Sequence, residues 1–78
     1  MAPLPGPTRR ALRLLADAPG GCSEALTLAH GFRPALIAEL VQTRLASAYP
    51  RTVIAGGREV EVIVVWITDA GRVALARG

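Results

Sequence analysis

The chain has 78 residues, of which 51% are hydrophobic and 19% charged, and its nine basic residues outnumber six acidic ones to give a net charge of +3. A chain of this length forms one small domain, and this apolar content excludes a disordered chain. The single cysteine, Cys22, has no partner for an intrachain disulfide. The sequence therefore excludes a disulfide scaffold and favours a reducing, cytoplasmic compartment.

The N-terminal segment, residues 1–7, has proline or glycine at four positions and lacks the apolar region of a secretory signal. We expect residues 1–7 to form a flexible arm and residues 8–78 to form the domain. No stretch approaches the roughly 20 apolar residues that span a bilayer, so we expect no membrane association. The small excess of arginine permits nucleic-acid binding without establishing it.

The first helix is predicted over residues 8–18, where Leu12, Leu15 and Ala18 recur on one stripe. Thr8 is its expected N-cap, and the proline and glycines at 19–21 are expected to end it. Three arginines lie largely off the apolar stripe and could contact a DNA backbone: Arg9, Arg10 and Arg13.

A short second helix is predicted over residues 24–30. Ser23 is its expected N-cap, and Gly31 stands where a left-handed residue ends many helices. The side of this helix that faces the core is expected to be made of Ala25, Leu26 and Ala29, with Leu28 also available.

The third helix is predicted over residues 34–45, because proline suits the first helical turn and the residue before it avoids helical geometry. Its apolar stripe consists of Leu36, Ile37, Leu40, Val41 and Leu45. The opposite side is expected to face outward and carries Ala35, Ala38, Glu39, Gln42 and Thr43. The short, glycine-containing connection between the second and third helices is the pattern of a helix-turn-helix.

Two strands are predicted over residues 51–55 and 58–68, where the periodicity becomes alternating. Gly56 and Gly57 between them fit a two-residue turn that needs positive φ at both positions. In this register Val53 faces Val60 and Arg51 faces Val62, which places Val60, Val62, Val64 and Trp66 on one face and Glu59 and Glu61 on the other. Pro50 fits only a strand start or an edge.

A last helix is predicted over residues 69–76, with Thr68 as its N-cap and Asp69 in its first turn. The three aromatic residues, Phe32, Tyr49 and Trp66, are expected in the core.

This order of elements resembles the winged-helix domains of MarR-type and PadR-type bacterial repressors. Leu40-Val41-Gln42-Thr43-Arg44-Leu45 is similar to the family's L-x-x-x-G-L at the end of the recognition helix. Ile67-Thr68-Asp69-Ala70-Gly71-Arg72-Val73-Ala74-Leu75 is similar to the family's L-T-x-x-G-x-x-x-L after the wing. The resemblance implies an α+β winged helix-turn-helix with three helices, a two-stranded wing hairpin and a short C-terminal helix. It also implies a cytoplasmic transcriptional regulator that binds double-stranded DNA.

The sequence departs from the family pattern at two points. Arg44 stands where the family usually has glycine. The long flanking helices that form the family's dimer and effector pocket have no counterpart, so we expect no small-molecule effector pocket. A homodimer stays open, because specific DNA sites usually consist of two half-sites.

The expected DNA-binding residues are Arg33, Ala35, Ala38, Glu39, Gln42, Thr43, Arg51 and Arg58. A helix fits the major groove, where Arg33 could pair with guanine and Gln42 with adenine. The wing arginines, expected near the tip of the hairpin, could meet phosphates or enter the minor groove. The carboxylates of Glu59 and Glu61 would repel phosphate. The alternative interpretation is therefore a winged helix that binds a protein partner and not DNA.

We expect no enzyme activity, no cofactor and no metal ion. The lone histidine, His30, has no neighbouring cluster of histidine or cysteine that would make a metal site. Cys22 lies among glycines, and no base and orienting acid for a nucleophile are evident. Most of the arginines, taken singly, are expected to be solvated surface.

Overall fold

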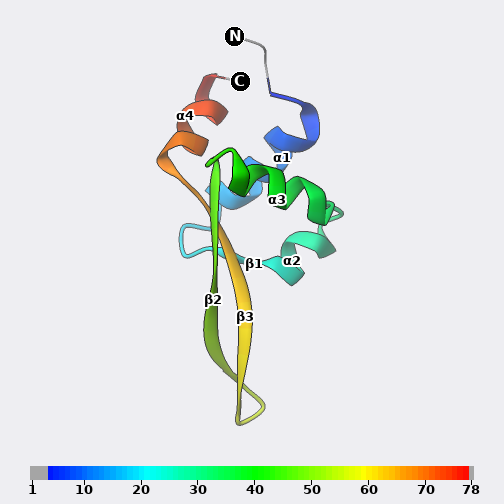
Figure 1. The fold of residues 1–78 in the computed structure, drawn as a ribbon, viewed down its shortest axis with the longest axis vertical. Coiled ribbons are helices and arrows are strands. Elements are labelled where there is room, and N and C mark those ends of the chain that lie inside the picture. Colours follow the sequence, from blue (N-terminus) through cyan, green and yellow to red (C-terminus); the bar gives the residue numbers. More distant parts are fainter. Residues whose placement is uncertain (1–3, 78) are drawn as a thin grey trace.

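A computed structural model describes residues 4–77, in which four helices and a three-stranded antiparallel sheet form an α+β fold (Figure 1). The helices gather at one end of the molecule and a long hairpin projects from them, so that the overall dimensions are 48 × 22 × 20 Å. The elements in chain order are α1 (Gly6–Ala16), β1 (Cys22–Ser23), α2 (Glu24–Ala29), α3 (Pro34–Gln42), β2 (Ala46–Ala55), β3 (Arg58–Ile67) and α4 (Asp69–Arg77).

Helix α1 begins at Gly6, two residues earlier than predicted, so Gly6 and Pro7 belong to the helix and not to the expected arm. Thr8 is not the N-cap, because it lies inside the helix and is buried. Proline near the first position explains the early start, since its missing N–H would have no helical partner there. The helix ends before the predicted stop at 19–21. Residues 1–3 of the expected arm lie outside the described residues.

The predicted N-cap of α2 is confirmed, because the Ser23 hydroxyl accepts a hydrogen bond of 3.1 Å from the N–H of Leu26. Gly31 follows the helix with φ of +92°, the left-handed geometry expected for a helix end. The predicted buried side is wrong: Ala25, Leu26 and Ala29 are all exposed. The buried residue is Thr27, whose hydroxyl donates to the carbonyl of Ser23 at 3.0 Å.

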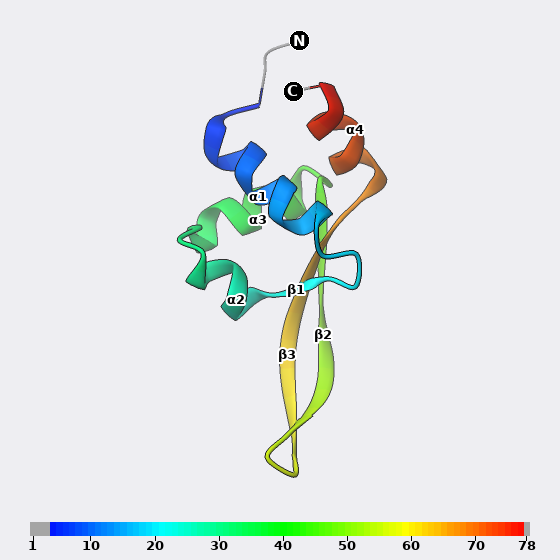
Figure 2. The ribbon, with the colours of Figure 1, turned by 180° about the vertical axis from the view of Figure 1, so that it is seen from behind.

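Strand β1, which was not predicted, explains this change of phase. Cys22 pairs with Val65 and Ser23 with Val64, so the chain enters α2 directly from the sheet. The helix therefore starts in an orientation that turns Thr27 inward, against the sulfur of Cys22 at 3.3 Å. Figure 2 shows β1 crossing the hairpin near its base and leading into α2.

Helix α3 begins at Pro34 as predicted but ends at Gln42, three residues earlier than predicted. Ile37 and Leu40 are buried, whereas Val41, expected in the core, is 37% exposed. Arg44 terminates the helix with φ of +63°, the left-handed geometry for which glycine is usually needed. The helix end thus has the backbone geometry of a glycine terminus although the residue there is arginine.

The hairpin has the predicted register: Val53 faces Val60, and Arg51 faces Val62. Gly56 and Gly57 form its turn with φ of +60° and +77°. Strand β2 starts at Ala46, five residues earlier than predicted. Pro50 is therefore inside β2, where it is tolerated because the strand order β1-β3-β2 makes β2 an edge.

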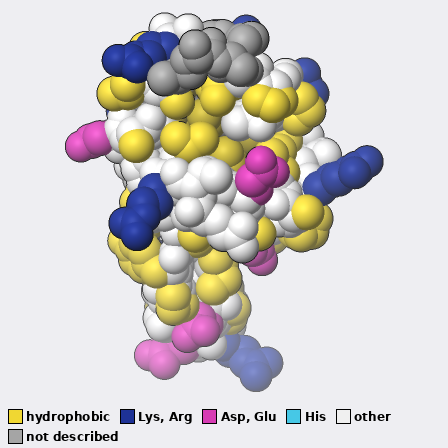
Figure 3. All heavy atoms as spheres, turned by 45° about the horizontal axis from the view of Figure 1, so that its top comes forward, with side chains coloured by type: hydrophobic (Ala, Val, Ile, Leu, Met, Phe, Trp, Pro, Cys, Tyr) yellow, Lys and Arg dark blue, Asp and Glu magenta, His cyan; other side chains and the backbone are white. Residues whose placement is uncertain are grey.

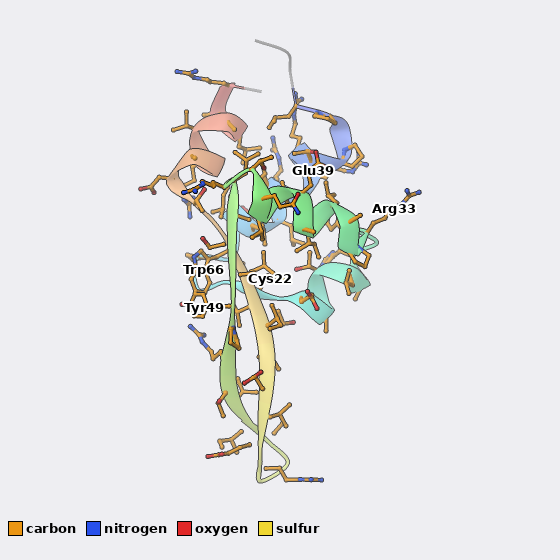
Figure 4. All side chains as sticks on the ribbon, in the orientation of Figure 1. Cys22, Arg33, Glu39, Tyr49 and Trp66 are labelled. Atoms are coloured by element: carbon orange, nitrogen blue, oxygen red, sulfur yellow. The ribbon has the colours of Figure 1, made fainter. Side chains whose placement is uncertain are left out.

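The core lies where α1 and α3 pack on the base of the hairpin, and its buried members are Ala11, Leu12, Leu15, Cys22, Ile37, Leu40, Ala46, Val65 and Ile67. Phe32 is half-buried and packs against this cluster, as predicted. Tyr49, also expected in the core, is 44% exposed. Its ring meets the half-buried Trp66 edge-on at 4.0 Å between centroids, on the side of the hairpin away from α2 and α3 (Figure 4).

Helix α4 has the predicted N-cap, because the Thr68 hydroxyl accepts a hydrogen bond of 3.0 Å from the N–H of Gly71. Gly71 is buried against the α3–β2 connection, and a Cβ there would collide with the carbonyl of Leu45. The N-terminus of α4 is therefore held directly against the chain that leaves α3.

Candidate nucleic-acid interface

The outward side of α3 is uncovered along its whole length. Residues at positions 35, 38, 39 and 42 recur every three or four residues, so they share one side of the helix. The exposed residues that were expected there are Ala35, Ala38, Glu39, Gln42 and Thr43. The sequence prediction of which side faces outward is thus confirmed for every one of these positions.

The first half of this side of α3 offers only small apolar side chains, and the second half carries polar groups. Ala35 and Ala38 carry no polar group and let another surface approach closely. Glu39 offers a carboxylate, and Gln42 offers an amide that can donate and accept together. The hydroxyl hydrogen of Thr43 is already used within the helix end, because Oγ1 donates to the carbonyl of Glu39 at 2.8 Å. Thr43 can therefore act only as an acceptor toward a partner.

Arg33 stands at the N-cap of α3 and is exposed. It projects from the end of α3 that lies far from the hairpin (Figure 4). Arg10 of α1 borders the same open groove of about 660 Å³, whose floor includes Phe32 and Leu36. Of the three arginines noted on α1, Arg10 is thus brought to the start of α3. Glu39 also lines this groove, so the groove carries both signs of charge.

Arg58 lies at the tip of the hairpin, as predicted, whereas Arg51 does not. Arg51 pairs with Val62, four rungs from the terminal pair of Ala55 and Arg58. At roughly 3.3 Å a residue, this places Arg51 about 13 Å from the tip. Both side chains are exposed. The prediction of a two-arginine tip is therefore wrong for Arg51, because β3 extends the ladder past it to the base.

The two faces of the hairpin carry opposite charges beyond its base. Directly paired residues share a face, and successive residues alternate between faces. The register therefore defines an arginine face, made of Arg51, Val53, Ala55, Arg58, Val60 and Val62. It also defines a glutamate face, made of Thr52, Ile54, Glu59 and Glu61. The expected conflict between wing acids and wing arginines is thus relieved, because the two kinds of charge point to opposite sides.

The positions of Tyr49 and Trp66 show which face of the hairpin points away from α2 and α3. Tyr49 pairs with Val64 and Trp66 with Ser47, in the same alternation as the arginine face. Their side chains project to the side of the hairpin away from α2 and α3 (Figure 4). The arginine face is therefore directed away from the helices, and the glutamate face lies on the helix side.

Basic side chains lie around the margin of the surface seen in Figure 3, whose centre is largely apolar and neutral with an acidic side chain within it. Arg44 is a further basic residue beside α3, and the sequence prediction did not select it. It is exposed at the end of α3 and borders an open groove of about 580 Å³ with Val41, Tyr49 and Asp69. The one sequence feature that distinguished Arg44 is its position, because it stands where the L-x-x-x-G-L pattern has glycine.

Comparison with known proteins adds no relative: no protein-family model matches the chain, and no curated protein or solved structure matches it. Within residues 4–77 no group of three His, Cys, Asp or Glu side chains could hold a metal ion. No helix in the same part of the chain has the length and apolar character to cross a membrane. Function therefore has to be inferred from the geometry of α3 and the hairpin.

Proposed function

We propose that this chain is a winged-helix domain that binds double-stranded DNA and regulates transcription. The observation that carries the proposal is the uncovered outward side of α3, with the arginine-bearing hairpin following three residues after the helix ends. An α-helix with a small, polar outward side fits the major groove of B-DNA. A projecting hairpin can contact the adjoining backbone at the same time.

The connection of the elements supports this proposal. A helix, a short strand, two closely spaced helices and a hairpin follow one another, and the short strand pairs with the second strand of the hairpin. This order of elements supports the winged-helix proposal. Two helices separated by a short glycine-containing turn are the helix-turn-helix unit, whose second helix enters the groove.

In the proposed complex the outward side of α3 reads the bases, from Arg33 at its N-cap to Gln42 at its last residue. Arg33 is the donor for guanine O6 and N7, and Gln42 is the partner for adenine N6 and N7. The alanines at 35 and 38 allow the helix to lie deep in the groove. The carboxylate of Glu39 accepts from cytosine N4, the major-groove donor with which Glu and Asp side chains usually pair.

The hairpin supplies contacts that position the domain without reading sequence. Arg58 at the tip and Arg51 farther up the same face reach phosphates or the minor groove. The glutamate face lies on the side of the hairpin that carries α2 and α3. Its carboxylates therefore oppose phosphate on that side, and the arginines alone carry the proposed backbone contacts.

The proposal is tested by titrating the protein with duplex DNA at two salt concentrations. Affinity is expected to fall steeply with salt, and Arg58→Ala is expected to reduce the slope of log K against log salt by about 0.9. Arg33→Ala should cost about 1–3 kcal/mol on sites with the preferred guanine and less on other sequences. Arg77→Ala, at the end of α4, is the control for lost charge and should change neither property. Absence of duplex affinity at low salt would end the proposal.

A protein-binding winged helix is the second candidate, and Glu39 is the observation that favours it. This carboxylate is exposed in the middle of the α3 side that would otherwise read DNA. Apolar side chains are also exposed nearby, among them Val41 at 37% and Leu26 at 52%. A folded chain without duplex affinity at low salt would select this candidate over DNA binding.

A further inference from the structure

The outer half of the hairpin, residues 51–62, has two chemically complementary faces, and neither is covered by another element. Only Val53 and Val62 in this segment are half-buried, and all its other residues are exposed. The arginine face places valines between two positive charges, Arg51 and Arg58. The glutamate face places Ile54 beside two negative charges.

The apolar exposure on these faces is unusual for surface that meets only water. Ile54 is 70% exposed, the most of any large hydrophobic side chain in the described part of the chain, and Val60 is 41% exposed. Apolar side chains rimmed by charge are typical of interaction surfaces. Each face carries charge of one sign. The best partner for it is therefore an apolar surface that carries charge of the opposite sign.

We propose that a second copy of this chain is that partner, and that its glutamate face packs on the arginine face of the first copy. Each face offers an apolar centre to the other, with two arginines opposite two glutamates. Two faces of the same kind would instead bring like charges together. The inference goes beyond DNA binding and does not depend on it.

The shape of the molecule fixes the relative orientation of the two copies. Packed sheets lie about 10 Å apart, whereas the molecule measures 22 × 20 Å across its long axis. Two copies whose hairpins pointed the same way would therefore overlap at their helices. The hairpins must point in opposite directions, with the tip of each beside the Arg51–Val62 pair at the inner end of the other's outer half.

The spacing of the charges suits this antiparallel arrangement. Arg51 and Arg58 lie four rungs apart, and Glu59 and Glu61 lie two rungs apart. At roughly 3.3 Å a rung, the arginines span about 13 Å and the glutamates about 7 Å, so the two arginines straddle the two carboxylates. The long arginine side chains cover the remaining few ångströms.

The proposed contact is weak, and it does not limit the assembly to two copies. A face of this size falls well short of the roughly 800 Å² per partner of a stable interface, and exposed ion pairs are screened by salt. The interface joins two different faces, so a bound pair still presents one unoccupied face of each kind and can add further copies. Association should therefore grow with protein concentration and vanish at high salt.

Sedimentation equilibrium of the full chain, across concentrations at low and high salt, tests the inference. The mass of the wild type should rise above the monomer value of 8.2 kDa at low salt and return to it at high salt. The double substitutions E59R/E61R and R51E/R58E should each abolish association, because every pair of faces then carries like charge. An equimolar mixture of the two variants should associate again.

The control variant D17R/E24R makes the same change in net charge as E59R/E61R, at exposed positions away from the outer hairpin. It should associate like the wild type. A wild type that stays monomeric at every concentration, or a mixture that fails to associate, overturns the inference.

Measuring both duplex binding and self-association of the variant E59Q/E61Q distinguishes a failure of this inference from a failure of the proposed function. These carboxylates lie off the arginine face, so DNA affinity should persist while self-association falls by about three- to tenfold. If self-association instead matches that of the wild type, the contact proposed here is wrong whatever the DNA result. If DNA affinity is absent in the wild type, only the proposed function fails.

Discussion

The hydroxyl of Thr68 donates a hydrogen bond of 2.6 Å to the carbonyl oxygen of Arg44, and the N–H of Thr68 donates to the neighbouring Leu45 carbonyl at 3.1 Å. The same hydroxyl accepts from the N–H of Gly71. One side chain therefore joins the end of α3 to the start of α4. The orientation of α3 relative to the hairpin depends on this junction, because the chain passes through it just before β2 and just after β3.

Replacing Thr68 with alanine should lower the free energy of unfolding by about 1–2 kcal/mol, since it removes an N-cap and leaves the Arg44 carbonyl without its donor. Thermal or urea unfolding measures the loss. Thr68→Ser keeps the hydroxyl and should recover most of the stability. Equal losses in both variants would show that the methyl group matters and the hydrogen bonds do not.

Replacing Gly71 with alanine should be costly, because the added Cβ would collide with the Leu45 carbonyl and with the Ile67 side chain. Overpacking of this kind costs about 1–3 kcal/mol, and here backbone has to move. Gly20→Ala is the matched control, because nothing lies within 4 Å of a Cβ at that position. Urea unfolding should show a lower midpoint for the first variant and no loss for the second.

Replacing Arg44 with glycine should raise the stability. Its φ of +63° disfavours a side chain by roughly 1–2 kcal/mol, and the entropy cost of glycine offsets part of the gain. A net increase of about 0.5–1 kcal/mol in the free energy of unfolding is expected. Arg44→Ala keeps the Cβ and should give no such increase. If alanine stabilises as much as glycine, the charge and not the backbone is responsible.

Replacing Glu39 with glutamine tests the charge on the outward side of α3. If that side meets DNA, removing the carboxylate should tighten duplex binding at low salt by about 1.5- to 5-fold, the size of one exposed charge interaction. Glu24→Gln, on α2, is the control for the change in net charge. Sites with cytosine opposite position 39 should gain least, because there the charged acceptor of cytosine N4 becomes a weaker, neutral one. Fluorescence anisotropy with labelled duplexes measures both effects.

The sequence predicted the elements whose signals are local. The helix-ending glycine at 31, the cap at Ser23 and the turn at 56–57 each depend on a few adjacent residues, and all were correct. The outward side of α3 followed from helical periodicity alone. The register of the hairpin followed from the length of its turn.

The features that the sequence missed depend on contacts between distant residues. Strand β1 is two residues long and has no periodic signal of its own; it exists because Cys22 and Ser23 lie beside β3. Its presence sets the phase of α2 and buries Thr27 in place of the more apolar neighbours. Arg51 was expected near the tip although its predicted pairing with Val62 already placed it four pairs from the turn. Tyr49 is exposed because its register puts it on the arginine side of the hairpin, opposite the side that carries the buried core residues Val65 and Ile67.

The local stability of the hairpin falls from its base to its tip. Near its base Val65 is fully buried, whereas the outer half has no helix beside it, and an isolated two-stranded hairpin is only marginally stable in water. Amide protons near Gly56 and Gly57 should therefore exchange with solvent through local fraying, long before the helices open. A partner that binds the outer hairpin has to offset the conformational entropy that is lost when the hairpin becomes ordered. Slower hydrogen exchange at the Gly56 and Gly57 amides therefore reports such binding directly.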